Sequence, residues 1–362
     1  MKFAVKNIKN AVSNVLKNTK ASELYFYGYG ESVIVSAAGK QIVGAVKVSA
    51  IESQPKEAFG ISGKYIYEML NATDADEVVI QKNDNLVEVK AGKSRWKLVA
   101  LSNVPPTYKK VEAPNLVLGF SEIRYKELMA RALPFIASEE AVSAFNGLTV
   151  MVRENECTIY GATRSCVSEQ KFRIAETGAD KTVVLWREVA ALSLPSDVEW
   201  RIGNTTIEVV SGDERYTMPL LSAPAPNFER VFPDTSTAKE IVVSKAAIND
   251  AVERVGLCAR VVESTPLQIT INDQNVRLYA SSELVGNAEE SVVTLNKTGI
   301  DGDTIGVSSR YMEKMVKACS SVKLKITYTG DPLKPIIFEN DAVTADNEVR
   351  WTGVVAPVRL KN

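Results

Sequence analysis

The sequence contains no histidine among its 362 residues. Histidine is the usual general base near neutral pH and the commonest zinc ligand, so its absence excludes a histidine-based triad and a histidine-ligated metal. Cysteine is scarce as well, and Cys157, Cys166, Cys258 and Cys319 include no C-x-x-C motif. We therefore expect buried free thiols in a reducing compartment, and no cofactor.

Long hydrophobic runs are also missing. No apolar stretch reaches the roughly 18 residues that span a bilayer, and the start at Met1 lacks the apolar core of a signal peptide. A cytoplasmic protein without a membrane partner is expected. Neither sign of charge dominates, since 43 Lys and Arg face 44 Asp and Glu. Any attraction to nucleic acid must therefore come from local clusters of basic residues.

The chain has the composition of a folded protein, with 45% hydrophobic and 24% charged residues. Its length favours two or three domains, and an internal repeat favours three. A strand, a small polar residue and an amphipathic helix follow one another from near Lys2, Leu116 and Glu240. The expected helix caps are Asn7, Ser121 and Ser244.

Each repeat continues with a second short helix and antiparallel hairpins. The second helices are expected at residues 63–70, 186–192 and 310–316. An arginine-aromatic pair then marks the closing strand of each repeat: Arg95-Trp96, Arg215-Tyr216 and Arg350-Trp351. Proline-bearing stretches place the boundaries, so we predict an α+β protein with domains at 1–117, 118–237 and 238–362.

Three segments resemble the bacterial beta-type DNA sliding clamp, the DNA polymerase III beta subunit. They are residues 92–98, residues 224–233 and the C-terminal Val354-Val355-Ala356-Pro357-Val358-Arg359-Leu360 with its Pro-x-Arg-Leu ending. The resemblance implies a non-enzymatic processivity factor. Two chains would join head to tail as a homodimer ring, with the helices lining a central hole and the sheets outside.

The resemblance also implies the partners. The ring would encircle double-stranded DNA without reading its sequence, be placed there by a clamp loader, and tether a replicative DNA polymerase. Contacts to phosphates by basic side chains suit such sliding. The DNA-binding candidates lie on polar helix faces: Lys9, Lys17, Lys20, Lys126, Arg131, Lys245, Arg254, Arg310, Lys314 and Lys317. Each of them could equally be ordinary solvated surface charge.

Clamps of this type bind partners through short peptides that dock in an apolar cleft. The matching residues are Phe145, Thr163, Val167, Pro226, Arg230, Val231, Leu333, Pro335, Val354, Ala356, Pro357, Val358, Arg359 and Leu360. Packing of an interdomain core is the alternative explanation for the apolar members. The loop at residues 163–167 departs from the family's Thr-Asp-Gly-His-Arg sequence, which predicts a different peptide preference.

Ring closure is expected to pair the edge near Trp96 and Leu98 with the region of Leu257 and Cys258 in a second chain. Two other functions stay open. Carboxylates at Asp74, Asp76 and Glu77, or at Asp301 and Asp303, could form a metal site for nucleic-acid hydrolysis. The chain could also be a clamp-like scaffold that binds proteins and encircles no DNA.

Overall fold

The computed structural model describes residues 1–102, 106, 108–138, 143–175, 180–236, 238–261, 265–272, 274–298, 302–341 and 349–360. They form two compact units, residues 1–127 with 185–221, and residues 128–184 with 222–362. One order of elements occurs three times along the chain: strand, helix, four strands, helix, three strands. The paired strands run antiparallel, so the predicted α+β class is confirmed.

The first series comprises β1 (Lys2–Ala4), α1 (Val5–Thr19), β2 (Glu23–Tyr29), β3 (Ser32–Ala38), β4 (Val43–Ser49), β5 (Ala58–Ser62), α2 (Gly63–Ala72), β6 (Glu77–Asn83), β7 (Leu86–Ala91) and β8 (Ser94–Val99). The second comprises β9 (Leu116–Phe120), α3 (Glu122–Ala132), β10 (Gly147–Arg153), β11 (Glu156–Ala162), β12 (Cys166–Arg173), β13 (Lys181–Trp186), α4 (Arg187–Ala191), β14 (Val198–Ile202), β15 (Thr206–Ser211) and β16 (Glu214–Pro219). The third comprises β17 (Lys239–Ser244), α5 (Lys245–Arg260), β18 (Pro266–Ile271), β19 (Asn275–Ser282), β20 (Gly286–Thr298), β21 (Thr304–Ser308), α6 (Ser309–Ala318), β22 (Lys323–Tyr328), β23 (Ile336–Asn340) and β24 (Arg350–Val355).

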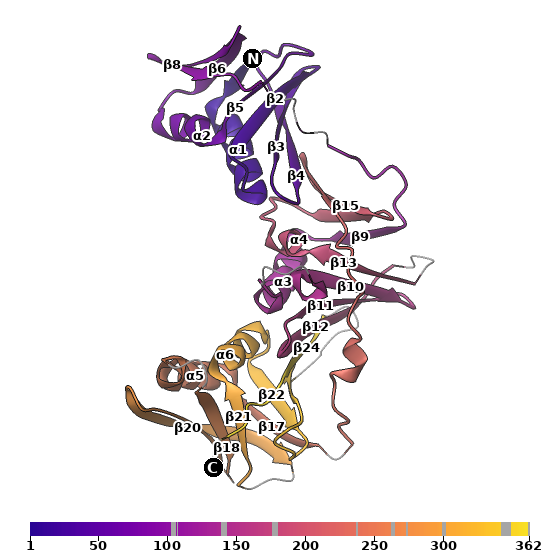
Figure 1. Ribbon diagram of the computed structural model, residues 1–362, viewed down its shortest axis with the longest axis vertical. Coiled ribbons are helices and arrows are strands. Elements are labelled where there is room, and N and C mark those ends of the chain that lie inside the picture. The colour runs from indigo at the N-terminus through magenta and orange to yellow at the C-terminus, as the bar shows by residue number, and fades with distance from the viewer. Residues whose placement is uncertain are drawn as a thin grey trace. The chain divides into compact units, whose positions relative to one another are not determined.

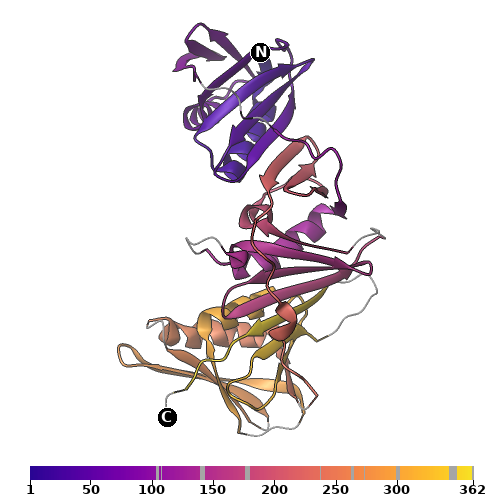
Figure 2. The same cartoon turned by 45° about the vertical axis from the view of Figure 1, so that its right-hand side comes forward.

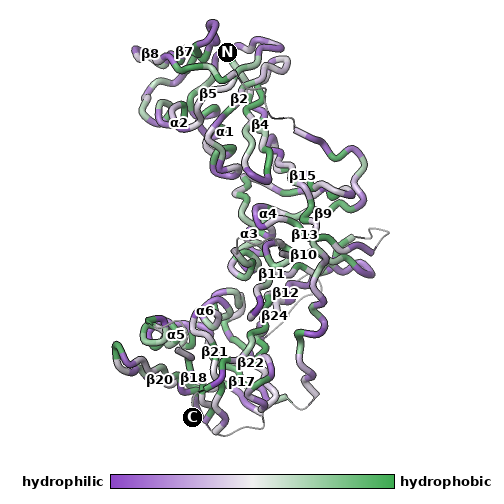
Figure 3. The backbone as a smooth tube through the Cα atoms, viewed as in Figure 1, coloured by the Kyte–Doolittle hydropathy of each residue, from purple (hydrophilic) through white to green (hydrophobic). Residues whose placement is uncertain are grey.

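The first unit contains a four-stranded sheet, β1-β6-β7-β8, and an eight-stranded sheet, β5-β2-β3-β4-β16-β15-β14-β9. Helix α1 packs on β3 and β4 and lies beside α2 (Figure 1). Its buried face consists of Ile8, Ala11, Val12 and Val15, at the spacing of one helix face. Hydrophobic residues recur along α1 and β2 in Figure 3, as expected for elements that share a core.

The helix caps follow the predictions in two of three repeats. Ser244 accepts a hydrogen bond from the Ala247 backbone N–H at 3.4 Å, and Ser121 accepts one from that of Arg124 at 3.3 Å. The prediction for Asn7 is wrong, because α1 already begins at Val5 after Ala4. The first strand is only three residues long, so the chain turns into the helix two residues before the expected cap.

Two repeats join within the first unit through β4 and β16, which pair from Val43 with Thr217 to Val46 with Glu214. Gly44 is needed there, because a Cβ at this position would lie 2.8 Å from the ring of Tyr216. A buried polar network reinforces the junction. Asn14 donates to the Glu214 carboxylate at 2.5 Å, and Asn18 donates to the Tyr216 hydroxyl at 2.8 Å.

The second unit contains a 12-stranded sheet in the order β13-β10-β11-β12-β24-β23-β22-β17-β20-β19-β18-β21. Here β12 pairs with β24, from Cys166 with Val355 to Lys171 with Arg350. Helices α5 and α6 pack against each other, and α5 covers β19 and β20 (Figure 2). In both units, therefore, the fourth strand of one series pairs with the last strand of the next series.

The two residues of an arginine-aromatic pair make different contacts. Arg95 forms an ion pair with Glu88 on the neighbouring strand, and Arg215 lies 3.5 Å from the buried Glu208. The aromatic partner faces the core or the junction. Trp351 donates its indole N–H to the Ser168 hydroxyl at 3.0 Å, and Tyr216 donates its hydroxyl to Glu214 at 2.8 Å.

The Glu214 network predicts a pH dependence of stability. Burial raises the pKa of Glu214 above its usual value, although the Tyr216 and Asn14 hydrogen bonds oppose this. A raised pKa in the folded state means that stability falls as the pH rises through it, because the charged form is disfavoured. The quantity to measure is the change in the urea midpoint between pH 5 and pH 8. Over this interval Glu214→Gln should lose less stability than wild type, because glutamine does not titrate. The exposed-residue control Glu31→Gln should behave like wild type; equal behaviour of all three proteins would contradict the prediction.

Candidate partner cleft and basic helices

A separate apolar cluster joins the second and third series of elements within the second unit. Its buried residues are Tyr160, Ala162, Val167, Phe228, Ile337 and Val354, with Phe145, Met151, Val231 and Phe232 packed around them. The structure thus brings together four residues of the predicted cleft, namely Phe145, Val167, Val231 and Val354. Sequence matching missed Tyr160 and Phe228, whose rings stack at 4.2 Å between centroids.

A tight turn forms one wall beside this cluster. The Thr163 backbone N–H donates to the Cys166 carbonyl at 2.9 Å, and the Thr163 hydroxyl accepts from the backbone N–H groups of Ser165 and Cys166 at 3.2 Å. The chain after β24 follows the turn, because the Ala356 N–H donates to the Ser165 carbonyl at 2.8 Å. The turn at residues 163–166 is therefore a compact polar loop held by its own hydrogen bonds.

The other predicted cleft residues lie around this cluster or away from it. Arg230, Ala356 and Arg359 are exposed, Leu333 is 59% exposed, and Pro226, Pro335 and Pro357 are half-buried. Residues 358–360 lie against β21 instead: the Val358 N–H donates to the Gly306 carbonyl at 2.8 Å, and the Leu360 side chain covers Gly306. An apolar centre with the exposed Arg230 beside it can bind a peptide by apolar anchors and polar rim contacts.

Helix α1 is the most basic of the helices with predicted DNA contacts. Its sequence contains Lys6, Lys9 and Lys17 and no acidic residue, and Lys20 follows at its C-cap in the left-handed conformation, with φ of 54°. Lys6, Lys17 and Lys20 are exposed, and Lys9 is half-buried. Sequence reasoning missed Lys6, because it placed the start of the helix after Asn7 and Lys6 therefore before the helix.

The basic residues of the other helices are largely neutralised by acids. Lys126 pairs with Glu122, and Arg254 pairs with Glu290 at 2.5 Å. Lys317 lies 2.6 Å from Glu313, which lowers the pKa of that carboxyl. The ammonium of Lys314 lies over the Tyr311 ring at 5.4 Å. The remaining candidates are the half-buried Arg131, the half-buried Lys245 and the exposed Arg310.

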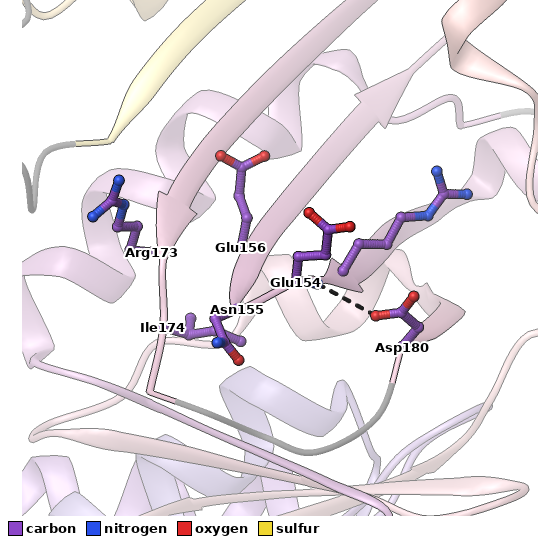
Figure 4. Close-up of a pocket in the computed structure, with 7 residues that line it drawn as sticks. Glu154, Asn155, Glu156, Arg173, Ile174 and Asp180 are labelled. Atoms are coloured by element: carbon purple, nitrogen blue, oxygen red, sulfur yellow. Dashed lines mark hydrogen bonds between the residues drawn. The ribbon is translucent and has the colours of Figure 1, made fainter.

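Two hollows in the second unit hold charged groups. One, of about 550 Å³, brings Lys245 and Lys317 together with Asp250 at the start of α5 and the end of α6. The other, of about 620 Å³, lies at the turn between β10 and β11 (Figure 4). Its arginine and carboxylate side chains include Glu156 and Arg173, which face each other across β11 and β12. Each hollow mixes basic and acidic side chains, so neither points to a particular catalytic reaction.

Two of the carboxylates considered for a metal site, Glu77 and Asp303, contact other groups. Glu77 lies 2.7 Å from Lys2, and Asp303 lies 2.5 Å from Lys239 and 3.2 Å from the Tyr328 hydroxyl. Asp301 lies outside the described residues. In the described part of the chain, no group of three or more acidic or cysteine side chains is arranged to hold a metal ion. No described helix is long and apolar enough to cross a membrane.

Comparison with known proteins matches this arrangement of elements. Residues 229–352 match the family "DNA polymerase III beta subunit, C-terminal domain". The Beta sliding clamp of Staphylococcus aureus is 20% identical over 299 residues, which cover 78% of this chain and 77% of that protein. The DNA polymerase sliding clamp of Bacillus subtilis superposes with a TM-score of 0.90 at 15% identity, covering 99% of both chains. This chain has the beta sliding clamp fold.

The DNA polymerase III subunit beta of Pseudomonas aeruginosa gives a similar result, with a TM-score of 0.89, 17% identity and coverage of 99% of this chain and 100% of that one. The predicted resemblance to beta-type sliding clamps is therefore confirmed, and it extends along essentially the whole chain. At such low identity the match establishes the clamp fold. It does not transfer individual contact residues, which depend on the side chains described above.

The stacked pair beneath the cleft predicts a stability effect. Phe228→Ala removes a buried ring from contact with Tyr160, and we expect a loss of about 3 kcal/mol in unfolding free energy. Arg230→Ala, an exposed change in the same turn, should alter it by less than about 0.5 kcal/mol. Urea unfolding followed by circular dichroism measures both. Equal effects of the two substitutions would show that the aromatic pair is not part of the folded core.

Proposed function

We propose that this chain is a DNA sliding clamp, which encircles duplex DNA as a head-to-tail homodimer and tethers a replicative DNA polymerase in the cytoplasm. The clamp fold along essentially the whole chain supports this most directly. A closed ring is retained by topology, so no single contact to DNA has to be strong. Its three repeats, with boundaries at 1–117, 118–237 and 238–362, would give six domains in a ring of two chains.

The two strand junctions inside the chain suggest how the ring closes. Each junction pairs the fourth strand of one series with the last strand of the next. The fourth strand of the third series is β20, and the last strand of the first series is β8. Residues 286–293 of β20 have β19 as their only described strand partner, and β8 is the terminal strand of its sheet. We propose that β8 of one chain pairs with β20 of another.

Side-chain exposure supports the same contact. Tyr216 and Trp351 are 0% and 2% exposed where their strands pair with a neighbouring repeat, whereas the equivalent Trp96 on β8 is only half-buried. Apolar side chains near both proposed edges also remain accessible. Val99 is 73% exposed, Val293 69% and Leu257 66%, whereas Leu98 and Cys258 are half-buried. A second chain would cover this surface, in line with the interface residues predicted from the sequence.

The apolar cluster around Tyr160 and Phe228 supports docking of partner peptides. We propose that polymerase and the clamp loader insert apolar anchor residues beside Val167 and Val231, with Arg230 at the rim. Peptides of this kind obtain most of their binding energy from a few buried side chains. We propose that the chain acts as a non-catalytic processivity factor without a cofactor.

Topology provides the decisive test of the proposed function. After loading by a clamp loader, the protein should stay on circular duplex DNA and slide off when the circle is linearised, and light scattering should give the mass of two chains. Val99→Asp, together with Val293→Asp, should weaken the dimer and abolish retention, because both place charge at the proposed interface. Ile51→Asp, also on an exposed residue but outside every proposed contact, is the control and should leave both the dimer and retention intact.

A monomer that binds circular and linear DNA equally would refute encirclement and favour the scaffold alternative. A divalent-metal-dependent loss of the DNA itself would instead favour the nuclease alternative. Retention of the Val99→Asp, Val293→Asp protein equal to that of wild type would leave the clamp function standing but refute closure through β8 and β20.

The charge of α1 predicts which basic residues matter most for DNA affinity. Lys17 and Lys20 are exposed and lie on or beside a helix without acids, whereas Lys126 and Lys317 are already paired. Each phosphate contact contributes roughly 0.9 to the slope of log affinity against log salt. Lys17→Gln with Lys20→Gln should therefore lower the magnitude of that slope by about 1 to 2 units. Fluorescence anisotropy with a short labelled duplex, measured at several salt concentrations, gives the slope. A larger effect of Lys126→Gln with Lys317→Gln would contradict this ranking.

A further inference from the structure

A hollow of about 330 Å³ lies at the junction of the first and second series, within the first unit. Its walls come from the turn before β4, the end of β16, and Lys109. Ile42 and Met218 are buried at its base, and Thr206 and Pro219 contribute further surface. The function proposed above leaves this hollow unused.

The hollow occupies the position that the partner cleft has at the next junction. In the first repeat the Gly39 N–H donates to the Ile42 carbonyl at 2.8 Å, just as the Thr163 N–H donates to the Cys166 carbonyl at 2.9 Å in the second. The residue after each turn, Val43 or Val167, then faces the last strand of the following repeat. Both sites are thus built by the same backbone geometry.

The chain keeps the geometry at the first junction but changes the chemistry of its walls. The cluster at the second junction contains stacked aromatic rings, whereas the first hollow has a small apolar base and two exposed lysines, Lys40 on the turn and Lys109 between β8 and β9. No carboxylate is among its described lining residues. Such a site attracts negative charge, and the apolar base can accept one aliphatic side chain.

A close backbone contact holds the turn in place. A Cβ on Gly39 would lie 1.9 Å from the carbonyl oxygen of Thr19 and 3.2 Å from the Ile42 side chain. The turn therefore packs directly on the end of α1, and the Ile42 side chain is 3% exposed beneath it. Lys40 is consequently presented on a fixed turn, which reduces the entropy lost when a ligand binds.

We propose that this hollow is a second docking groove, which takes a short acidic peptide carrying one aliphatic anchor residue. The anchor sits over Ile42 and Met218, and flanking carboxylates face Lys40 and Lys109. The inference rests on the proposed docking function, because it extends that function to the equivalent position of the preceding repeat. A clamp with both sites would bind two kinds of partner peptide, one selected by apolar anchors and one by acidic charge.

The test uses the full chain and a labelled peptide, Asp-Leu-Glu-Leu-Asp, with one leucine replaced by a photoreactive analogue. Its control is the peptide with the acids changed to Asn and Gln. By fluorescence anisotropy, Lys40→Glu with Lys109→Glu should weaken binding of the acidic peptide by about tenfold. The matched pair Lys56→Glu with Lys82→Glu reverses two exposed lysines that do not line the groove and should change binding less than about twofold.

Cross-linked positions, mapped by mass spectrometry, separate the two docking sites. Cross-links at residues 39–43 or 217–219 that disappear in the Lys40→Glu, Lys109→Glu protein support the groove. Cross-links confined to residues 160–167, 226–232 or 354–356 would overturn it while leaving the proposed partner cleft intact. Equal binding of the acidic and amide peptides, or no binding of either, would also overturn the proposed groove. Cross-links in the groove alone would support the groove and count against the partner cleft.

Discussion

Backbone hydrogen bonding between successive repeats is the interaction on which the rest of this structure depends. A strand at the edge of a sheet presents a row of unpaired donors and acceptors. At both junctions inside the chain, β4 with β16 and β12 with β24, that row is satisfied by the next repeat. The pairing extends one sheet across two repeats. It also buries the aromatic residue that closes each of these repeats, Tyr216 or Trp351.

The same junctions create the candidate binding sites. A turn precedes the fourth strand, and the last strand of the next repeat pairs beside that turn; a hollow lies there at the first junction and an apolar cluster at the second. Side chains then decide what the hollow can bind. The second junction is filled by the stacked Tyr160 and Phe228 and suits apolar anchors. The first has Lys40 and Lys109 and suits acidic groups.

Because the chain is nearly neutral overall, basic residues can attract DNA only where they cluster without acidic neighbours. Helix α1 has only basic charged residues, whereas three of the six basic residues of α5 and α6, namely Arg254, Arg260 and Lys317, form ion pairs with acidic residues. Such pairing lowers the attraction that a helix exerts on phosphates. Under the proposed function, the DNA contact would be uneven among the repeats: α1 would contribute most, and the paired helices would provide a surface over which a duplex could move without strong local binding.

The sequence by itself determined the repeated order of elements, since apolar spacing and polar caps are local properties of the chain. It therefore predicted the six α-helices of the described residues, the closing strands, and four residues of the apolar cluster. It could not predict that Lys126 and Lys317 are neutralised, that Tyr160 stacks on Phe228, or that Val358 and Leu360 lie along β21. These contacts join residues whose positions follow from strand register and packing. Only the tertiary structure fixes that register, because many registers satisfy the same alternation of apolar and polar residues.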